Sequence, residues 1–318
     1  MTLHWKACCK YCLLLLFFIS DAITAFAQTD FDGIMMRKNN LCIGPMYSHS
    51  SWKNYWEGTL KRENLNLGTV TTQMFSVMGN YGITDKLNIL FSAPYVTTKT
   101  SAGTLHSQKG IQDGSLWLKW MPVERKLGKG DFSIYGIAGV SAPLTNYVAD
   151  YLPLSLGLRS KTLSLRAMGD YQLGKFFVTA SGTYVFRSNI KIDRDAYYTT
   201  EMHYTNEVEM PNVITWNVRT GYRQPNLIAE AFIENMITPG GFDITRNNMP
   251  FPSNMMNATR LGVWVKYELN VPRGLSIIGT GNYVVAGRNV GQATTIGAGI
   301  FQIIDFNKKK TASSSPQK

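Results

Sequence analysis

Hydrophobic and polar side chains alternate along most of this chain. In the stretch RLGVWVKYEL (260–269), leucine, valine and tyrosine occupy every second position, and charged or small residues mostly fall between them. Alternation with a period of two puts the two sets on opposite faces of a β-strand. We predict twelve such strands, at 41–52, 69–82, 87–97, 111–121, 132–142, 161–172, 176–188, 212–223, 227–237, 258–269, 275–286 and 293–306. Strands of soluble proteins average about 5–6 residues, whereas a tilted strand that crosses a bilayer needs about 9–11.

The connections between the predicted strands are sorted by length. Five are short and carry residues that suit a tight reversal: 84–86, 124–130, 173–175, 224–226 and 270–274. They alternate with five long connections: 53–68, 98–110, 143–160, 189–211 and 238–257. The last connection of the long series, 288–292, is short. Short turns at one end and long loops at the other are typical of outer-membrane barrels, in which the short turns face the periplasm.

The predicted fold class is therefore an all-β, antiparallel transmembrane β-barrel of about 12 strands in a bacterial outer membrane. Its first partner would be the lipid of that membrane. In water, the same alternation would describe a sheet with an apolar core and a solvated outer face. Strand length and the sorting of the loops favour the membrane.

The first residues have the features of a secretory signal peptide. Two lysines precede a short apolar run, and Ala25-Phe26-Ala27 offers a small-x-small cleavage site before Gln28. The predicted organisation is a signal peptide over 1–27, an outer-membrane β-barrel over 28–306 and a disordered polar tail over 307–318.

Cysteine content and charge narrow the chemistry. Cys42 is the only cysteine after the predicted signal, which argues against an internal disulfide or a cysteine metal cluster. The formal net charge is +11, and without the signal it is 30 basic minus 20 acidic residues, or +10. A basic excess suits anionic lipid headgroups or a lumen that prefers anions. Its scattered placement in an exported chain argues against a nucleic-acid partner.

A set of charged residues falls on the predicted inward face of the strands. If the apolar faces meet lipid, these side chains face the lumen. The candidate lumen-lining residues are Lys119, Arg166, Asp170, Arg219, Arg223, Glu230, Glu234, Lys266 and Glu268. A tight turn at 224–226 would put Arg219 roughly opposite Glu230. Arg223 and Glu234 would lie one step further along the same face.

Barrel size leaves two outcomes for these ions. Twelve strands lie between the filled barrels of about eight strands and the open porins of about 16. The ions either pair tightly and fill a narrow barrel or line a wet path. We favour a narrow polar lumen.

Two stretches resemble a known family. YGITDKLNILFSAPYV (81–96) joins a Tyr-Gly-x-Thr-Asp turn to a strand ending in Pro-Tyr-Val, and GIQDGSLWLKWMP (110–122) carries Gly-x-x-Asp-x-x-Leu-x-Lys. The pair is similar to the family named for the meta-pathway of phenol degradation, whose members are outer-membrane transporters of hydrophobic compounds. The resemblance implies a barrel of this type that passes apolar small molecules. Gln112 departs from the more usual Gly-Leu-Gly-Asp form of the second motif.

The motif residues also have a purely structural interpretation. Gly82 and Gly110 permit tight backbone turns, and Pro94 near a strand end can signal a bulge or bend. We expect Asp113 to pair with a basic residue on a neighbouring strand.

Candidate catalytic and metal sites are weak. His49 lies in YSHSSW, where Ser51 would share its face of the strand. No carboxylate at a recognisable spacing orients His49, so a solvated rim histidine is favoured over a catalyst. His203 lies near three glutamates that could hold a divalent cation, but a solvated acidic loop is the favoured interpretation. We predict that the protein is not an enzyme and has no catalytic residue, bound metal or cofactor.

The sequence therefore favours an outer-membrane channel or transporter for small molecules, including hydrophobic ones. The alternative is a closed barrel whose long outer loops, especially 189–211, bind a partner or surface. A lipid hydrolase that uses His49 is the third hypothesis.

Overall fold

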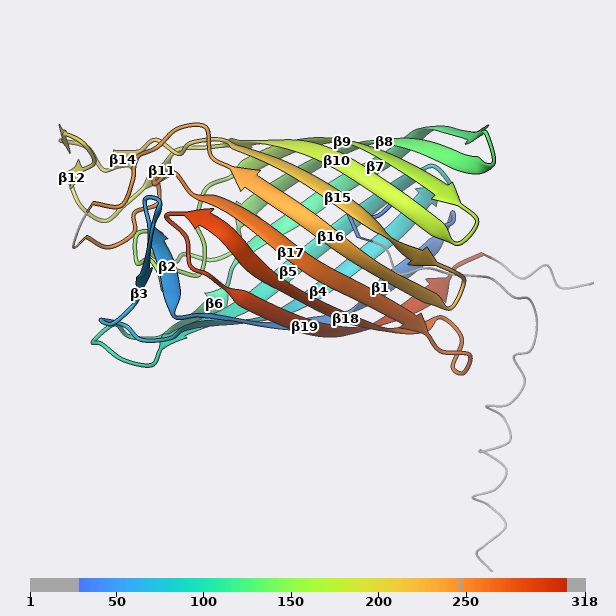
Figure 1. Ribbon diagram of the computed structural model, residues 1–318, viewed down its shortest axis with the longest axis horizontal. Helices are drawn as coiled ribbons and strands as arrows, with labels where there is room; N and C mark the ends of the chain where they lie inside the picture. The colour runs from blue at the N-terminus through green and yellow to red at the C-terminus, as the bar shows by residue number, and fades with distance from the viewer. Residues whose placement is uncertain (1–28, 246–247, 308–318) are drawn as a thin grey trace, which may run out of the picture.

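Twelve long antiparallel strands form the wall of a closed barrel in the computed structural model, which describes residues 29–245 and 248–307 (Figure 1). They are β1 (Asn40–Trp52), β4 (Val70–Thr84), β5 (Leu87–Thr100), β7 (Asp113–Leu127), β8 (Gly130–Pro143), β9 (Thr162–Leu173), β10 (Phe176–Arg187), β15 (Val213–Arg223), β16 (Leu227–Ile237), β17 (Asn257–Glu268), β18 (Leu275–Arg288) and β19 (Thr294–Asp305). Each pairs with its neighbours along the chain, and β1 pairs with both β4 and β19, which closes the ring. The short strand β6 (Gln108–Ile111) pairs with β5 beyond the end of the β5–β7 ladder.

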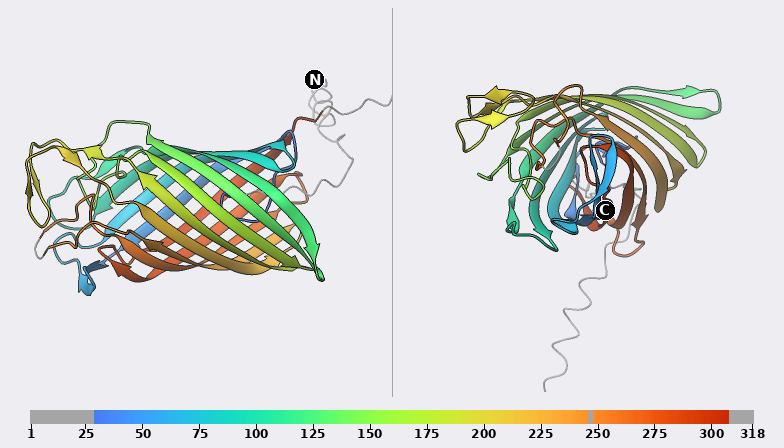
Figure 2. Two further views of the ribbon diagram at one scale, coloured as in Figure 1. Left: turned by 90° about the horizontal axis from the view of Figure 1, so that it is seen from above. Right: turned by 60° about the vertical axis from the view of Figure 1, so that its left-hand side comes forward.

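All twelve predicted strands are confirmed, with ends that differ by a few residues. The largest difference lies at the predicted turn 124–130, because β7 continues to Leu127 and β8 begins at Gly130. Gly128 makes the remaining tight reversal with a φ of 62°, a conformation that a residue without a Cβ adopts freely. The strands are inclined to the barrel axis, as closure of a sheet requires (Figure 2).

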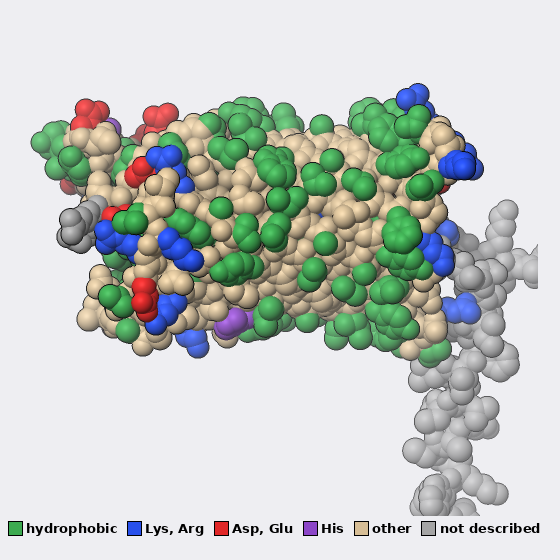
Figure 3. Space-filling view, in the orientation of Figure 1, with side chains coloured by type: hydrophobic (Ala, Val, Ile, Leu, Met, Phe, Trp, Pro, Cys, Tyr) green, Lys and Arg blue, Asp and Glu red, His purple; other side chains and the backbone are tan. Residues whose placement is uncertain are grey.

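The outer surface carries the apolar half of the alternating pattern. Trp120, Val263 and Ile300 are each more than half exposed, at 53%, 54% and 52%. In the view of Figure 3, charged side chains gather near the two ends of the barrel and the middle carries apolar ones. A closed barrel satisfies its backbone hydrogen bonds from strand to strand, so this surface can face hydrocarbon. No helix in the described part of the chain could span a membrane.

The long connections gather at one end and the short turns at the other (Figure 1). The long ones carry small strands of their own: β2 (Asn54–Glu57), β3 (Leu60–Glu63), β11 (Ile190–Lys191), β12 (Tyr197–Tyr198), β13 (Met202–His203) and β14 (Glu207–Val208). β2 pairs with β3, β11 with β14 and β12 with β13. The sorting of loops predicted from the sequence is therefore confirmed. The predicted signal peptide and nearly all of the predicted tail lie outside the described residues.

A hydrogen-bonded cluster ties two of these loops to the end of β18. Arg288 donates from Nε and an Nη atom to the two carboxylate oxygens of Asp243, each at 2.7 Å. The side-chain amide of Asn289 donates to the same carboxylate at 2.7 Å, and its Oδ1 atom accepts from the backbone N–H groups of Gly58 and Ile244. The hydrogen bond from Arg288 lowers the pKa of Asp243, with Asn289 adding to the effect.

Candidate functional site

The chain preceding β1 enters the barrel at the end where the short turns lie. We call residues 29–39 the N-terminal segment. Ile34 and Met36 are 9% and 1% exposed, and they pack among apolar side chains of the wall that include Phe177 and Trp264. The barrel interior at this end is therefore occupied by the chain itself.

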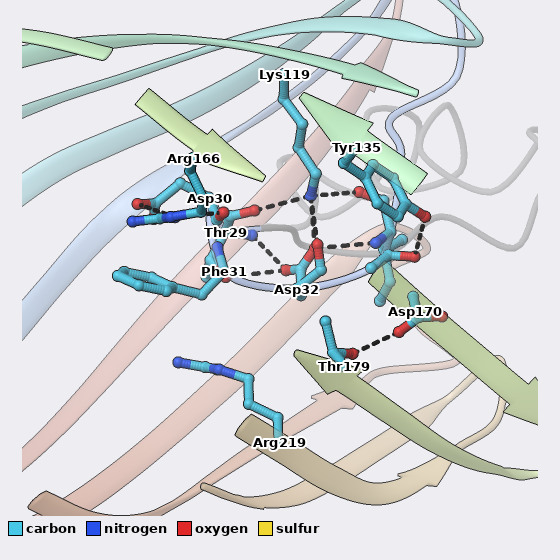
Figure 4. Close-up of polar contacts among 12 residues, drawn as sticks. Thr29, Asp30, Phe31, Asp32, Lys119, Tyr135, Arg166, Asp170, Thr179 and Arg219 are labelled. Carbon is cyan, nitrogen blue, oxygen red and sulfur yellow. Dashed lines mark hydrogen bonds and ion pairs between the residues drawn. The ribbon is translucent and has the colours of Figure 1, made fainter. Parts of the chain in front are cut away.

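Lys119 is the main polar contact of the N-terminal segment. Its side chain is fully buried, and four acceptors lie within 3.0 Å of its Nζ. They are the carbonyl oxygens of Thr29, Asp32 and Ile34, at 3.0, 2.6 and 2.8 Å, and the Asp32 carboxylate at 3.0 Å (Figure 4). A buried ammonium is tolerated where its donors are used and an opposite charge is in contact. The segment supplies both.

Arg166 makes a second set of contacts with the same segment. It donates from an Nη atom to the carbonyl and carboxylate oxygens of Asp30, at 2.6 and 3.0 Å. Its guanidinium carbon lies 3.7 Å from the ring centroid of Phe31, a cation–π contact. Tyr135 donates its hydroxyl to the carbonyl of Gly33 at 2.8 Å (Figure 4). Strands β7, β8 and β9 therefore contact six consecutive residues of the segment, 29–34.

Gly33 lies against the next charged group of the wall. A Cβ atom at this position would lie 2.2 Å from a carboxylate oxygen of Asp170, so the close approach requires glycine. Asp170 is held by both Nη atoms of Arg223, at 3.1 and 3.2 Å, and by the hydroxyl of Thr179 at 2.5 Å. This bidentate pair spans from β9 to β15 across β10.

The β15–β16 hairpin confirms one expected ion pair and corrects another. Arg219 and Glu230 are buried and bonded, although the residue directly opposite Arg219 is Phe232, so the arginine reaches diagonally. The prediction that Arg223 and Glu234 lie close together, one step along from the first pair, is wrong. In this antiparallel hairpin, residue numbers rise toward the turn on β15 and fall toward it on β16. Arg223 therefore lies beside the turn, opposite Ile228, and Glu234 lies far from it.

Glu234 instead finds a partner on the following strand. Arg260 of β17 donates to its carboxylate at 2.6 Å. Further down β17, Lys266 and Glu268 lie 3.5 Å apart on one face. All nine residues predicted on the inward face are buried or half-buried, and each is within an ion pair. Their part in a solute path stays a prediction.

A loop enters the barrel from the opposite end. Residues 144–161, between β8 and β9, bring Leu154 to 0% exposure, and Thr98 of β5 donates to its carbonyl at 2.6 Å. Tyr147 of the same loop donates its hydroxyl to Asp113 at 2.5 Å. The expectation that Asp113 pairs with a base is therefore wrong, because the loop brings a tyrosine hydroxyl to it. The motif around Asp113 anchors the inserted loop.

An internal cavity of about 270 Å³ lies beside the N-terminal segment. Thr29 and Asp30 contribute one part of its lining, and strands β1, β4, β5, β7, β17, β18 and β19 contribute the rest. Most of the lining is apolar, with Met46 and Trp264 among it, and Ser92 and Ser115 add hydroxyl groups. The segment lies against β7, β8 and β9, and the cavity occupies space toward the other side of the ring.

The histidines considered as candidate catalytic or metal-binding residues make contacts of other kinds. Ser50, which precedes Ser51 and follows His49 in β1, accepts a hydrogen bond from the hydroxyl of Thr295 on β19 at 2.9 Å. His203 stacks on Tyr197 with ring centroids 4.8 Å apart and hydrogen bonds to Thr199. Among the described residues, no group of three or more histidine, cysteine, aspartate or glutamate side chains is placed to hold a metal ion.

Sequence reasoning missed the N-terminal segment. Residues 29–39 lack the alternation of a strand, and they lie between the predicted signal and the first strand. The available signal was the TDFDGIMM stretch (29–36), which holds two acidic residues, four large apolar ones and a glycine. That composition does not suit a solvated linker, since apolar residues need burial.

Comparison with known proteins places this architecture. The crystal structure of the COG4313 outer membrane channel from Pseudomonas putida F1 has a TM-score of 0.68 and 14% sequence identity, and the match covers 88% of this chain and 100% of that one. The translocator domain of the autotransporter NalP from Neisseria meningitidis has a TM-score of 0.45 and 11% identity, over 84% of this chain and 88% of that one. A mutant of the TodX monoaromatic hydrocarbon channel has a TM-score of 0.45 and 9% identity, over 85% and 91%. No family model and no curated protein matches the sequence.

The first of these likenesses concerns the fold. The chain has the fold of an outer-membrane β-barrel, and its apolar outer band matches the hydrocarbon of a bilayer. Its location is the outer membrane of a bacterial cell.

Proposed function

We propose that this protein is an outer-membrane channel for small, largely apolar molecules. The observation that carries the proposal is the internal cavity, which lies within the barrel beside the N-terminal segment and has a mainly apolar lining. Ligand sites are typically concave and apolar, with few polar groups. The outer-membrane channel named above shares the fold, and the motif pair at 81–96 and 110–122 supports membership in the family of the meta-pathway of phenol degradation.

The nine charged residues serve this function indirectly in our proposal. They are engaged with one another, with Arg260 or with the N-terminal segment, so they narrow the path and hold the segment in place. Passage of a solute toward the periplasm then requires the segment to move. The ion pairs of Asp30 and Asp32 would hold the segment in its docked position and break when it moves.

Uptake by whole cells tests the channel, because phospholipid vesicles are themselves permeable to apolar solutes. Cells that make the full-length protein should accumulate radiolabelled 1-naphthol several-fold faster than cells that lack it. Equal rates would contradict the proposal and favour the closed barrel whose outer loops bind a partner.

A paired variant tests the role of the segment. Asp30→Asn/Asp32→Asn removes both carboxylate charges that Lys119 and Arg166 contact, and should raise the conductance of the purified protein in planar bilayers. Asp131→Asn makes the same chemical change at an exposed position of β8 and should leave the conductance at the wild-type level. Equal conductance of the paired variant and the control would show that the segment does not limit the path.

A further inference from the structure

The cavity beside the N-terminal segment has two unlike sides. Met46, Met78, Trp264, Ile278 and Phe301 give it an apolar lining. Methionine side chains are flexible and polarisable, and they make favourable contacts with aromatic rings. This side of the cavity therefore suits flat apolar molecules of more than one shape.

The polar residues of the cavity lining are Thr29, Asn80, Ser92 and Ser115, which are uncharged, and one acidic residue, Asp30. Ser92 and Ser115 are neighbours across the β5–β7 ladder and bring two hydroxyl groups to the lining. Asp30 also lines the cavity, but its carboxylate is already bonded to Arg166 at 3.0 Å. The cavity would offer a charged ligand no opposite charge that is not already paired, so binding would carry a high desolvation cost. An uncharged molecule with an apolar body and one hydroxyl group fits the lining.

The size of the cavity sets the scale of the ligand. An apolar cavity of about 150 Å³ is large enough to bind benzene. The cavity here, of about 270 Å³, has room for a larger molecule, such as a bicyclic aromatic compound.

We propose that the cavity is a binding site for such a molecule and that binding and docking of the N-terminal segment stabilise each other. This inference rests on the proposed function and adds a regulation to it. Thr29 and Asp30 form part of the lining, so the cavity is complete only while the segment is docked. A ligand that prefers one of two states shifts the equilibrium toward that state, and the coupling is reciprocal.

The coupling means that the channel with bound ligand is closed by the docked N-terminal segment. At a ligand concentration ten times the Kd, the docked state gains about a factor of ten over the undocked one. The site would therefore hold its ligand until the segment is released, and it would not behave as an open pore.

Binding is measured first, with the purified full-length protein in detergent and 1-naphthol as the probe. Ser115→Phe fills the cavity and should weaken binding, followed by equilibrium dialysis, by tenfold or more. Leu116→Phe adds similar bulk one residue further along β7, on the exposed outer face, and should bind within about twofold of wild type. Because this variant is measured in the same detergent, it also serves as the control for naphthol that partitions into micelles. Equal binding by the two variants would overturn the proposed site.

The coupling is measured second. Asp32 is not part of the cavity lining, yet Asp32→Asn should weaken naphthol binding because it loosens the segment. In the wild-type protein, saturating naphthol should slow hydrogen exchange over residues 29–36, where the amide of Ile34 donates to Asp32 at 3.1 Å. Naphthol should have no such effect in Ser115→Phe.

The two proposals fail in different ways. Unchanged exchange in the wild-type protein at saturating naphthol would overturn the coupling, and this arm needs no variant to fold. Naphthol uptake by cells together with unimpaired binding by Ser115→Phe would leave the channel standing and remove the cavity site. Binding and coupling without uptake would remove the channel.

Discussion

The two sides of the barrel interior use different chemistry. The arc from β7 through β17 carries all nine charged residues predicted on the inward face, and they are buried or half-buried in ion pairs. The arc of β18, β19, β1, β4 and β5 presents methionine, aromatic, aliphatic and small polar side chains in the same zone. We call them the charged wall and the uncharged wall.

The difference follows from what each kind of contact specifies. Hydrogen bonds to buried charges are directional and costly to leave unmade, so the charged wall holds the N-terminal segment in one position. Apolar contacts are non-directional, and methionine adapts to several shapes. The uncharged wall can therefore border a cavity without fixing what fills it.

The comparison is tested most severely at Lys119. Lys119→Met keeps an unbranched side chain of similar length but removes the ammonium group. Asp32 and three backbone carbonyls then lose the donor that contacts them. Breaking a buried pair typically costs about 3–5 kcal/mol, so the segment should undock. Proteolysis or hydrogen exchange over residues 29–39 measures the loss.

Lys126→Met is the matched control for this variant. Lys126 lies on the same strand, β7, and is exposed. Its replacement should leave protection of the segment at the wild-type level. Similar protection in Lys119→Met and Lys126→Met would mean that the charged wall does not hold the segment.

The stability of the wall itself gives the second comparison. Glu230→Gln removes the charge that Arg219 contacts and should lower the free energy of unfolding by about 3 kcal/mol, since a buried guanidinium loses its counter-ion. Met78→Leu on the uncharged wall conserves volume and should cost less than about 1.5 kcal/mol. Urea unfolding in lipid vesicles compares the two. A larger loss in Met78→Leu would reverse the assignment of roles to the two walls.

The smallest expected effect lies at the outer rim, where charge is used in water. The pKa of Asp243 is lowered by its hydrogen bonds, chiefly from Arg288. A lowered folded pKa means that the contribution of this group to stability is present above its ordinary pKa and is lost as the pH falls through the folded value. The amide of Ile244 donates to the side-chain oxygen of Asn289, and its protection from hydrogen exchange, taken relative to the intrinsic rate at each pH, should therefore fall at acidic pH.

Asp243→Asn separates this group from other acid effects. The variant should remove most of the pH dependence of the protection near Ile244 and leave the protection of the barrel strands as it is. An unchanged pH profile in the variant would assign the titration to another group.

Much of the wall could be read from the sequence because it depends on local pattern. Period-two alternation sets which face of each strand meets lipid, and loop length sorts the two ends, so all twelve strands were predictable. The partner of each charge was not, because it depends on register. Arg219 reaches Glu230 diagonally, Arg223 bonds to Asp170 two strands away, and Glu234 bonds to Arg260.

By itself the sequence determined a barrel with charged residues turned inward, since these properties follow from the order of residues along each strand. Only the tertiary structure decided that the N-terminal segment fills one end, that the 144–161 loop enters the other and that a cavity remains beside the segment. The physical reason is distance along the chain. Lys119 and Asp32 are 87 residues apart, and no local pattern in either stretch records that closure of the barrel brings them to 3.0 Å.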